Sequence, residues 1–184
     1  HIISELEFKV PIFYLNTGFL FPETLKYIKD LQRLLSIDVR ALSSNISKLN
    51  QLDSNGKLLF VSDPDYCCNI NKVKPLVSTI AAYDVWINGV RADQNANRAS
   101  LQVFEKSLND KLRFHPMLEW SRKDVYDYIN KYQLPKHPLE KEGYASVGCE
   151  PCTRKHSFDE IERGGRWFGL TKSECGLHTE LIKK

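Results

Sequence analysis

Residues 10–42, VPIFYLNTGFLFPETLKYIKDLQRLLSIDVRAL, predict a β-α-β unit. The apolar run 10–15 is rich in β-branched and aromatic residues and ends at the NTG stretch 16–18, which is typical of a strand that runs into a loop. A proline opens the stretch 22–35, where leucine and isoleucine recur at helical spacing. Residues 37–42 alternate as a second strand. Two strands joined by a helix imply a parallel pair with a right-handed crossover.

The same alternation continues along the chain. We expect a helix at 73–81, strands at 84–88 and within 111–118, and a helix from Ser121 to Tyr132 in which Asp124 completes a capping box. The apolar run 57–62 is compatible with either strand or helix. From Pro138 onward Gly, Pro and Cys dominate. The pattern predicts one doubly wound α/β domain over residues 1–184, with a mostly parallel sheet and a loop-rich tail.

In a doubly wound domain the ligand lies at the carboxyl ends of the strands. The loops that follow strands are therefore the places to search for a site, namely 16–21, 89–98 and the tail. We expect residues 154–184 to form a mobile C-terminal segment, because glycines there provide hinge freedom.

Composition limits the kind of protein. The 184 residues are 42% hydrophobic and 27% charged, which is typical of a globular domain with one core. The apolar runs fall far short of the roughly 20 residues that span a bilayer, and residues 1 onward do not show a charged stretch followed by an apolar one. We therefore expect a cytoplasmic protein without a membrane partner. A net charge of +3 does not argue for nucleic acid, and the basic residues of the last third suit a small anion better.

Five cysteines form three groups: the adjacent pair Cys67-Cys68, the pair Cys149 and Cys152, and Cys175 alone. Cysteines in a reducing compartment stay as thiols or bind metal. The two pairs supply four thiolates, the ligand number of a tetrahedral zinc or a [4Fe–4S] cluster. Adjacent side chains diverge, which favours the separate iron corners of a cluster over one small zinc ion. Zinc, buried unliganded thiols and a strained disulfide are the alternatives.

Cys175 lies among basic residues, with Lys172 and His178 close by and Arg163 and Arg166 upstream. Nearby positive charge favours the thiolate form of a cysteine, which is the nucleophile. The plain alternative is a free cysteine on an exposed tail.

Cations also occur at two other places. Arg91 and Arg98 lie on the loop after the predicted strand 84–88, and arginine forks suit phosphate and sulfate oxygens. Lys72, four residues after the adjacent cysteine pair, would bring a cation toward both the metal and the anion.

Together these features resemble the sulfonucleotide reductases, the family of adenylylsulfate (APS) and phosphoadenylylsulfate (PAPS) reductases. The matching stretches are LNTGFLFPET (15–24), CCNINKVKPL (67–76), WINGVRADQNANRA (86–99), HPLEKEGYASVGCEPCT (137–153) and GRWFGLTKSECGLH (165–178). They cover most of the chain in the family's order. The resemblance implies an adenine-nucleotide alpha-hydrolase-like fold with the nucleophile on the tail.

The resemblance also implies a two-step reaction. Cys175 attacks the sulfate sulfur of APS and expels AMP, and thioredoxin or a glutaredoxin-like dithiol donor then releases sulfite from the S-sulfocysteine. Cys67, Cys68, Cys149 and Cys152 would hold a [4Fe–4S] cluster. His178 would act with Cys175, and the residues around the phosphosulfate would be Lys72, Arg98, Arg163 and Arg166, with Arg91 as a further candidate. Leu15, Thr17 and Gly89 would present backbone to the adenosine.

The chain departs from the family pattern at three points. Asn16 stands where the family usually has Asp, and Ala92 where it often has a second charged residue. The family's Ser/Gly-rich phosphate-binding loop would lie upstream of His1. The alternatives to an APS reductase are a PAPS reductase that keeps the cluster, a tRNA-modifying adenine-nucleotide-binding ATPase and a zinc-stabilised nucleotide-binding module. A homo-oligomer is compatible with the sequence.

Overall fold

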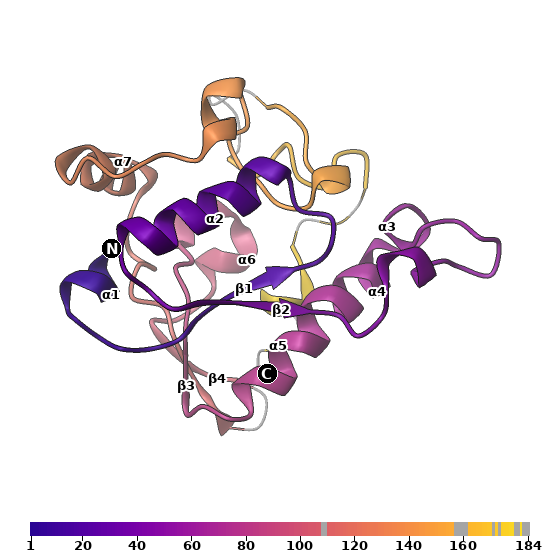
Figure 1. Ribbon diagram of the computed structural model, residues 1–184, viewed down its shortest axis with the longest axis horizontal. Helices are drawn as coiled ribbons and strands as arrows, with labels where there is room; N and C mark the ends of the chain where they lie inside the picture. Colours follow the sequence, from indigo (N-terminus) through magenta and orange to yellow (C-terminus); the bar gives the residue numbers. More distant parts are fainter. Residues whose placement is uncertain (108–109, 157–161, 171, 173, 179–180, 182–184) are drawn as a thin grey trace.

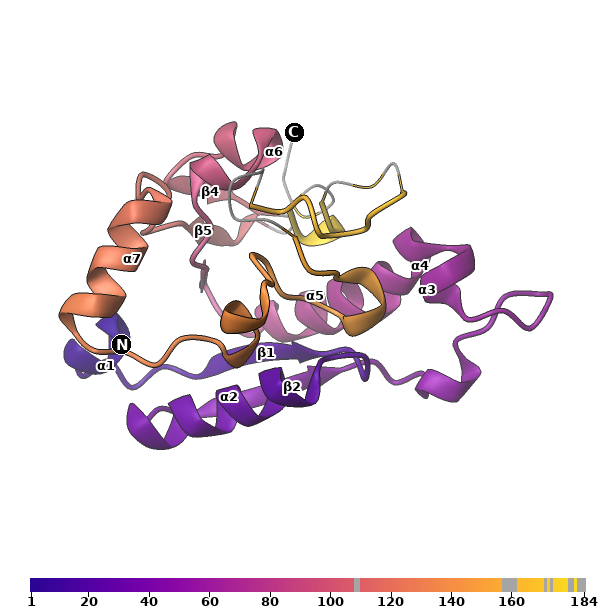
Figure 2. The ribbon, with the colours of Figure 1, turned by 90° about the horizontal axis from the view of Figure 1, so that it is seen from above.

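The β-α-β unit predicted for residues 10–42 is present. β1 (Ile12–Asn16) pairs in parallel with β2 (Val39–Ser43), and α2 (Pro22–Leu34) connects them with its proline in the first turn. α2 covers one face of this strand pair and α5 (Lys74–Ile80) covers the other, so the three layers are helix, strands and helix (Figures 1 and 2).

The structure is a computed structural model that describes residues 1–107, 110–156, 162–170, 172, 174–178 and 181. The remaining helices and strands are α1 (Ile2–Glu5), α3 (Leu59–Ser62), α4 (Pro64–Cys68), β3 (Val85–Ile87), α6 (Ala96–Ala99), β4 (Phe104–Lys106), β5 (Leu112–Phe114) and α7 (Arg122–Lys131). Short 3₁₀ or π-helical turns lie at Lys48–Asn50, Asn69–Val73, Ala92–Gln94, Pro138–Glu142, Glu150–Cys152 and Gly176–His178. Among the described residues, no helix combines the length and apolar character that crossing a bilayer requires.

The predicted mixed α/β organisation with parallel strand pairing is confirmed, with one addition. β3 and β5 pair in parallel, and β4, which sequence periodicity did not reveal, joins β5 as an antiparallel edge strand. The described strands thus form two ladders, β1-β2 and β3-β5-β4. A three-residue strand is too short for its alternation to be recognised, and its pairing with β5 is a tertiary contact.

Helix boundaries follow the predicted signals closely. Ser121 caps α7: its hydroxyl accepts a hydrogen bond from the Asp124 amide, and the Asp124 carboxylate accepts one from the Ser121 amide. This is the predicted capping box. Of the undecided run 57–62, residues 59–62 form the helix α3, which leads into α4, whereas Leu58 forms an isolated antiparallel bridge with Leu52. A helix is satisfied by its own backbone hydrogen bonds, whereas a strand here would need a neighbour.

The main apolar core lies between α5 and the strands. Val73, Leu76 and Ile80 of the helical stretch pack with Leu15 of β1 and Leu42 of β2. Leu181, 1% exposed, joins the same cluster from the C-terminal segment. The described end of the chain is therefore anchored in the core. Its position brings the Gly176–His178 turn against the π turn that follows α4.

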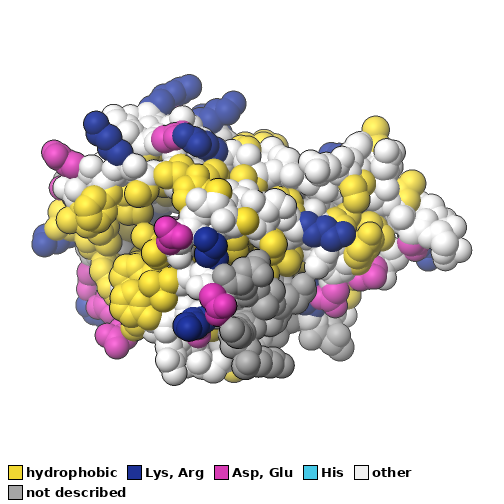
Figure 3. Space-filling view, turned by 90° about the horizontal axis from the view of Figure 1, so that it is seen from below, with side chains coloured by type: hydrophobic (Ala, Val, Ile, Leu, Met, Phe, Trp, Pro, Cys, Tyr) yellow, Lys and Arg dark blue, Asp and Glu magenta, His cyan; other side chains and the backbone are white. Residues whose placement is uncertain are grey.

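The β3-β5-β4 ladder has opposite characters on its two sides. Trp86, Arg113 and Glu105 form one cross-strand row that faces inward, with Arg113 fully buried and its guanidinium 4.7 Å from the Trp86 ring centre. Ile87 and Phe104 point outward and are largely exposed. Exposed hydrophobic side chains are visible between charged ones on the face in Figure 3, the side on which β3 and β4 lie in Figure 1. The row of Trp86, Arg113 and Glu105 therefore faces the interior of the protein and not the surface shown in Figure 3.

Candidate functional site

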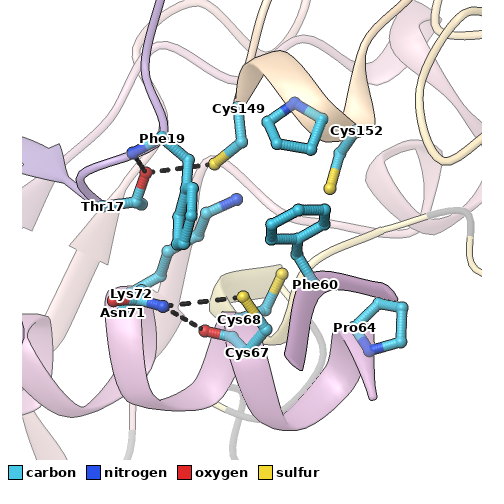
Figure 4. A pocket seen from close by; sticks show the side chains of 11 residues that line it. Thr17, Phe19, Phe60, Pro64, Cys67, Cys68, Asn71, Lys72, Cys149 and Cys152 are labelled. Atoms are coloured by element: carbon cyan, nitrogen blue, oxygen red, sulfur yellow. Dashed lines mark hydrogen bonds between the residues drawn. The ribbon is translucent and has the colours of Figure 1, made fainter. Parts of the chain in front are cut away.

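All four paired cysteines line one pocket. Cys67 and Cys68 come from the end of α4, and Cys149 and Cys152 flank the Glu150–Cys152 turn. In Figure 4 the first pair points into the pocket from the helix below it and the second from the opposite wall. Thr17, Phe19, Phe60, Pro64, Asn71, Lys72 and Pro151 complete the lining, and the empty space amounts to about 330 Å³ including its opening to solvent.

Local structure presents each pair. The Asp63 side chain accepts a hydrogen bond from the Tyr66 amide and caps α4, with Pro64 in its first turn. The second pair is held by the loop after β1, because Leu20 forms an isolated antiparallel bridge with Cys149 and the Glu150 amide donates to the Phe19 carbonyl at 2.7 Å. Two segments about 80 residues apart in sequence therefore meet through the β1 loop.

Polar side chains contact the sulfurs. Thr17 Oγ1 lies 3.2 Å from Cys149 Sγ, and Asn71 Nδ2 donates to Cys67 Sγ at 3.6 Å (Figure 4). Asn71 is itself fixed by reciprocal amide hydrogen bonds with Gln51, at 2.7 and 2.9 Å, and both residues are buried. Donors aimed at sulfur stabilise a thiolate, so the pocket is suited to thiolate ligands.

Burial raises the pKa of the Cys67 thiol to about 11, and the neighbouring Cys68 adds to the effect. The pKa values of Cys68 and Cys152 are raised by burial as well. Burial opposes the charge of Lys72, but attraction to negative charge on Cys149, Cys68 and Cys175 outweighs it, so the pKa of Lys72 is raised. The pocket therefore places a cation, Lys72, beside these cysteines. A bound metal would deprotonate them.

The four cysteines of the pocket are the candidate ligands for a metal group. Among the described residues, no three His, Cys, Asp or Glu side chains converge closely enough to hold one metal ion. Four cysteines nevertheless surround the same pocket. Cys67, Cys68, Cys149 and Cys152 could therefore hold a metal group between them, as the sequence predicts.

Cys175 lies next to this pocket. It is 7% exposed and packs in one cluster with Cys68 and Trp167, against which Cys152 also packs. Trp167 is 2% exposed and has a positive φ of 49°, an unusual conformation for a bulky side chain. Its amide donates to the Cys152 carbonyl at 3.0 Å, which ties the terminal segment to the second cysteine pair. The lone cysteine is thus buried beside the paired ones instead of exposed on a free tail.

Four cations surround the Trp167 ring. The distances from the charged group to the ring centre are 4.7 Å for Arg166, 5.5 Å for Arg163, 5.7 Å for Lys172 and 5.9 Å for Lys72. Cation–π attraction gathers positive charge in a partly desolvated place. The pKa of Arg163 is lowered by burial to about 10, so the guanidinium stays charged at neutral pH. The region is suited to an anionic ligand.

Space for Arg166 comes from Gly148. A Cβ at Gly148 would lie 2.0 Å from Arg166 Nη2, so any side chain there would displace the guanidinium. Arg166 Nη1 donates to the Val147 carbonyl at 3.3 Å. The glycine before Cys149 therefore allows Arg166 to lie close to the cysteine pocket.

Arg91 and Arg98 have acidic partners on the terminal segment. Arg91 pairs with Glu162 at 2.6 Å and Arg98 with Glu174 at 2.7 Å. Lys172 pairs with Asp65 of α4. These three ion pairs dock described parts of residues 154–184 onto the body, whereas residues 157–161, 171, 173, 179–180 and 182–184 lie outside the described part of the chain. The mobility that we expect of this segment remains a prediction.

His178 is buried behind Cys175. Arg113 Nη2 lies 3.1 Å from His178 Nδ1, and because a guanidinium can only donate, Nδ1 is the acceptor and the proton of the neutral ring is on Nε2. Burial, reinforced by the charge of Arg98, lowers the pKa of His178 to about 3. His178 is therefore a neutral hydrogen-bond donor at physiological pH.

The three residues expected near adenosine occupy different environments. Leu15 lies in β1 with its side chain against the core, Thr17 is buried at the cysteine pocket, and Gly89 follows β3 with Met117 3.4 Å from the position of a Cβ. Their backbone contacts with a nucleotide remain predictions.

Three kinds of site residue were missed from the sequence. Trp167 and Glu174 form the centre of the terminal segment, Asn71 and Gln51 orient Cys67, and Arg113 orients His178. The aromatic residue inside a run of arginines and lysines was an available signal for Trp167. The others depend on contacts between residues 65 or more positions apart, or on a buried amide pair, which no local pattern reveals.

Comparison with known proteins gives a consistent result. Residues 1–155 match the phosphoadenosine phosphosulfate reductase domain model. The chain is similar to the adenosine 5'-phosphosulfate reductase of Salinibacter ruber, with 36% identity over 97% of this chain and 72% of that protein. It is similar to the protein of the same name from Streptomyces coelicolor, with 38% identity over 97% of this chain and 76% of that protein.

Two solved structures show the fold. The phosphoadenylyl-sulfate reductase of Candida auris superimposes with a TM-score of 0.68 at 21% identity, covering 83% of this chain and 75% of that one. The FMN adenylyltransferase of Candida glabrata gives 0.57 at 15% identity, covering 91% of this chain and 58% of that one. At these identities the likeness concerns the fold alone.

The depressed pKa of His178 predicts a pH-dependent stability. An unfolded histidine takes up a proton below about pH 6.5, whereas the folded His178 does so only near pH 3. Its contribution to stability is therefore complete above pH 6.5 and is lost as the pH falls toward 3, by up to about 1.4 kcal/mol per pH unit. His178→Gln should reduce the slope of unfolding free energy against pH between 6.5 and 4.5, measured by urea denaturation. An unchanged slope would contradict the buried neutral assignment.

Proposed function

The chain belongs to the phosphoadenosine phosphosulfate reductase domain family, and from that premise we propose that it reduces adenylylsulfate to sulfite and AMP with electrons from thiols. The resemblance inferred from the cysteine, arginine and ECGLH stretches is thereby confirmed at the level of the family. The observation that carries the proposal is the position of Cys175, a buried cysteine that packs with Trp167 beside four others and among cations.

The site favours attack by Cys175 on an anionic sulfur ester. Lys72, Arg163 and Arg166 lie around the ring of Trp167, which packs with Cys175. Positive charge stabilises both a thiolate and the negative charge that develops on a leaving phosphate oxygen. The same three cations therefore serve the nucleophile and the leaving group.

The reaction balances in two steps. The Cys175 thiolate forms an S–S bond to the sulfonate sulfur while the bond from that sulfur to the phosphate oxygen breaks, and AMP leaves with the electron pair. An external thiol then attacks the Cys175 sulfur of the S-sulfocysteine adduct, and sulfite departs with the electrons of the S–S bond. A second thiol resolves the mixed disulfide, so a dithiol is oxidised by two electrons and the sulfate sulfur is reduced by two.

This chemistry needs one external partner and one hydrogen-bond donor within the site. The second step needs an external dithiol, for which thioredoxin or a glutaredoxin-like protein is the proposed donor. Within the site, the Nε2–H group of His178 is the proposed donor to an oxygen of the transferred sulfonate, since its ring is neutral and its Nδ1 is occupied by Arg113.

A [4Fe–4S] cluster is the proposed resident group of the cysteine pocket. Its ligands would be Cys67, Cys68, Cys149 and Cys152, whose side chains surround one space without converging on a single point. When bound, the cluster would supply a covalent cross-link between α4 and the Glu150–Cys152 turn and would tune the local electrostatics. Lys72 lines the same pocket and contacts Trp167, so it links the cluster side to the anion side.

APS is preferred to PAPS as the proposed substrate because the relatives at 36% and 38% identity are named adenosine 5'-phosphosulfate reductases. The two nucleotides differ only by a 3'-phosphate. The zinc module and the tRNA-modifying ATPase have no comparable support.

Cys175→Ser should abolish sulfite release and the S-sulfo adduct, because a hydroxyl is a far weaker nucleophile than a thiolate at neutral pH. The variant should keep its brown absorbance near about 400 nm, since the proposed cluster ligands are intact. Mass spectrometry after anaerobic incubation with APS measures the adduct. A sulfo group found on another residue, or retained turnover, would refute the assignment of the nucleophile.

Cys149→Ser should lose iron and acid-labile sulfide and lower the thermal stability, because metal binding and folding are coupled. Cys175→Ser is the matched control, a cysteine of the same neighbourhood that is outside the proposed ligand set. Iron analysis per chain decides the matter, and equal iron in the two variants would remove Cys149 from the ligands.

Turnover of the two nucleotides should differ. We expect kcat/KM for APS to exceed that for PAPS by at least about tenfold, a discrimination that one missing or unpaired phosphate contact supplies. Steady-state sulfite formation with a common dithiol donor measures the ratio. A preference for PAPS would reverse the choice of substrate while leaving the family chemistry in place.

A further inference from the structure

Glu174, the residue before the proposed nucleophile, is enclosed by five donors. Its side chain is 1% exposed. Oε2 accepts from Arg98 Nε at 2.7 Å and from Asn95 Nδ2 at 3.0 Å. Oε1 accepts from Arg163 Nη2 at 3.0 Å, from the Cys175 amide at 3.0 Å and from Arg98 Nη2 at 3.4 Å. One carboxylate thus joins two arginines to the backbone of Cys175.

This carboxylate is ionised. Burial by itself would raise the pKa of Glu174, but the hydrogen bond from Arg98 and the charges of Arg163 and Arg98 lower it to about 2. Arg98 and Arg163 are consequently paired with an internal anion. Both arginines belong to the set expected to contact the phosphosulfate.

The cations of the site therefore fall into two groups. Arg98 uses Nε and Nη2 for Glu174 and donates from Nη1 to Gln94 Oε1, so each of its three guanidinium nitrogens has a partner. Lys72 and Arg166, by contrast, have no carboxylate partner among the described residues. Lys72 and Arg166 are therefore available to bind one anionic group of a ligand. A second anionic group would lie against Arg98 and Arg163, which already pair with Glu174.

We propose that Glu174 is a positioning residue. Its carboxylate occupies the anion-binding position between Arg98 and Arg163 until the phosphosulfate of the substrate displaces it. This inference rests on the proposed function and extends it. Arginine forks bind carboxylate, phosphate and sulfate oxygens in the same manner, so the exchange leaves neither guanidinium unpaired. The same exchange releases the Cys175 amide from Glu174 and frees the nucleophile to approach the sulfonate.

The Glu174 carboxylate and the phosphosulfate would repel each other if both lay between the two arginines, so we expect one to replace the other. Two anions a few ångströms apart in a buried place repel each other strongly, because water screens their charges poorly there. Removing the Glu174 charge should therefore strengthen the binding of an anionic nucleotide. A purely structural Glu174 predicts the opposite, because its loss would disorder the arginines and weaken binding.

The experiment compares nucleotide affinity with reaction rate. In a Cys175→Ser protein loaded with its cluster, which cannot turn over, Glu174→Gln should bind APS about tenfold more tightly by equilibrium titration. In the protein with Cys175 intact, Glu174→Gln should form the S-sulfo adduct at saturating APS within about twofold of the parent rate, because the bound substrate has already displaced the carboxylate from the Cys175 amide. Glu174→Asp, which keeps the charge, should retain affinity within about twofold of the parent.

Glu162→Gln is the matched control. Glu162 is also on the terminal segment and also pairs with an arginine, Arg91, but it does not contact Arg98 or Arg163. Its substitution should leave APS affinity unchanged within about twofold. Equal tightening by both variants would show a general loss of negative charge and would overturn the proposal.

Unchanged or weaker APS binding by Glu174→Gln would also overturn it. If that variant fails to fold, hydrogen exchange in the Cys175→Ser protein gives a second test: APS should speed exchange of the residue 175 amide, and unchanged or slower exchange would overturn the exchange model. A failure of the proposed function would differ from all of these outcomes, since the parent protein would then bind neither APS nor PAPS and form no adduct.

Discussion

Buried positive charge around Trp167 is the constraint on which the site depends. Arg163, Arg166 and Lys72 lie about the ring of this enclosed tryptophan, where water screens charge poorly. Charges in such a place need counter-ions. One counter-ion is the carboxylate of Glu174, 3.0 Å from Arg163, and the cysteine sulfurs of the pocket would provide others if a bound metal deprotonated them.

The same constraint explains why the terminal segment is part of the site. Glu162 and Glu174 pair with Arg91 and Arg98 of the loop after β3, and Trp167 hydrogen-bonds to Cys152. Each contact neutralises or covers a group that would otherwise be exposed. A nucleophile carried on such a segment is positioned by electrostatics as much as by apolar packing, so an anionic substrate can compete for the residues that hold it.

The cysteine pocket and the proposed nucleophile, Cys175, lie next to each other. Cys68 belongs to the cysteine pocket and also packs with Cys175 and Trp167. Lys72 lines the pocket and faces the tryptophan ring. A change in charge at the cysteine pocket would therefore be felt directly at the nucleophile, without any need for long-range coupling.

The sequence by itself determined the features that are local or that recur as motifs. Periodicity predicted β1, α2 and β2, the Ser121–Asp124 capping box marked the start of α7, and the cysteine groups with the ECGLH stretch identified the family. Only the tertiary structure decided that residues 59–62 are helical, that β4 joins β5, and that Glu174 neutralises Arg98 from 76 positions away. Periodicity and capping are set by neighbours a few residues apart, whereas the partner of a buried charge is set by which distant segments the folded chain brings together.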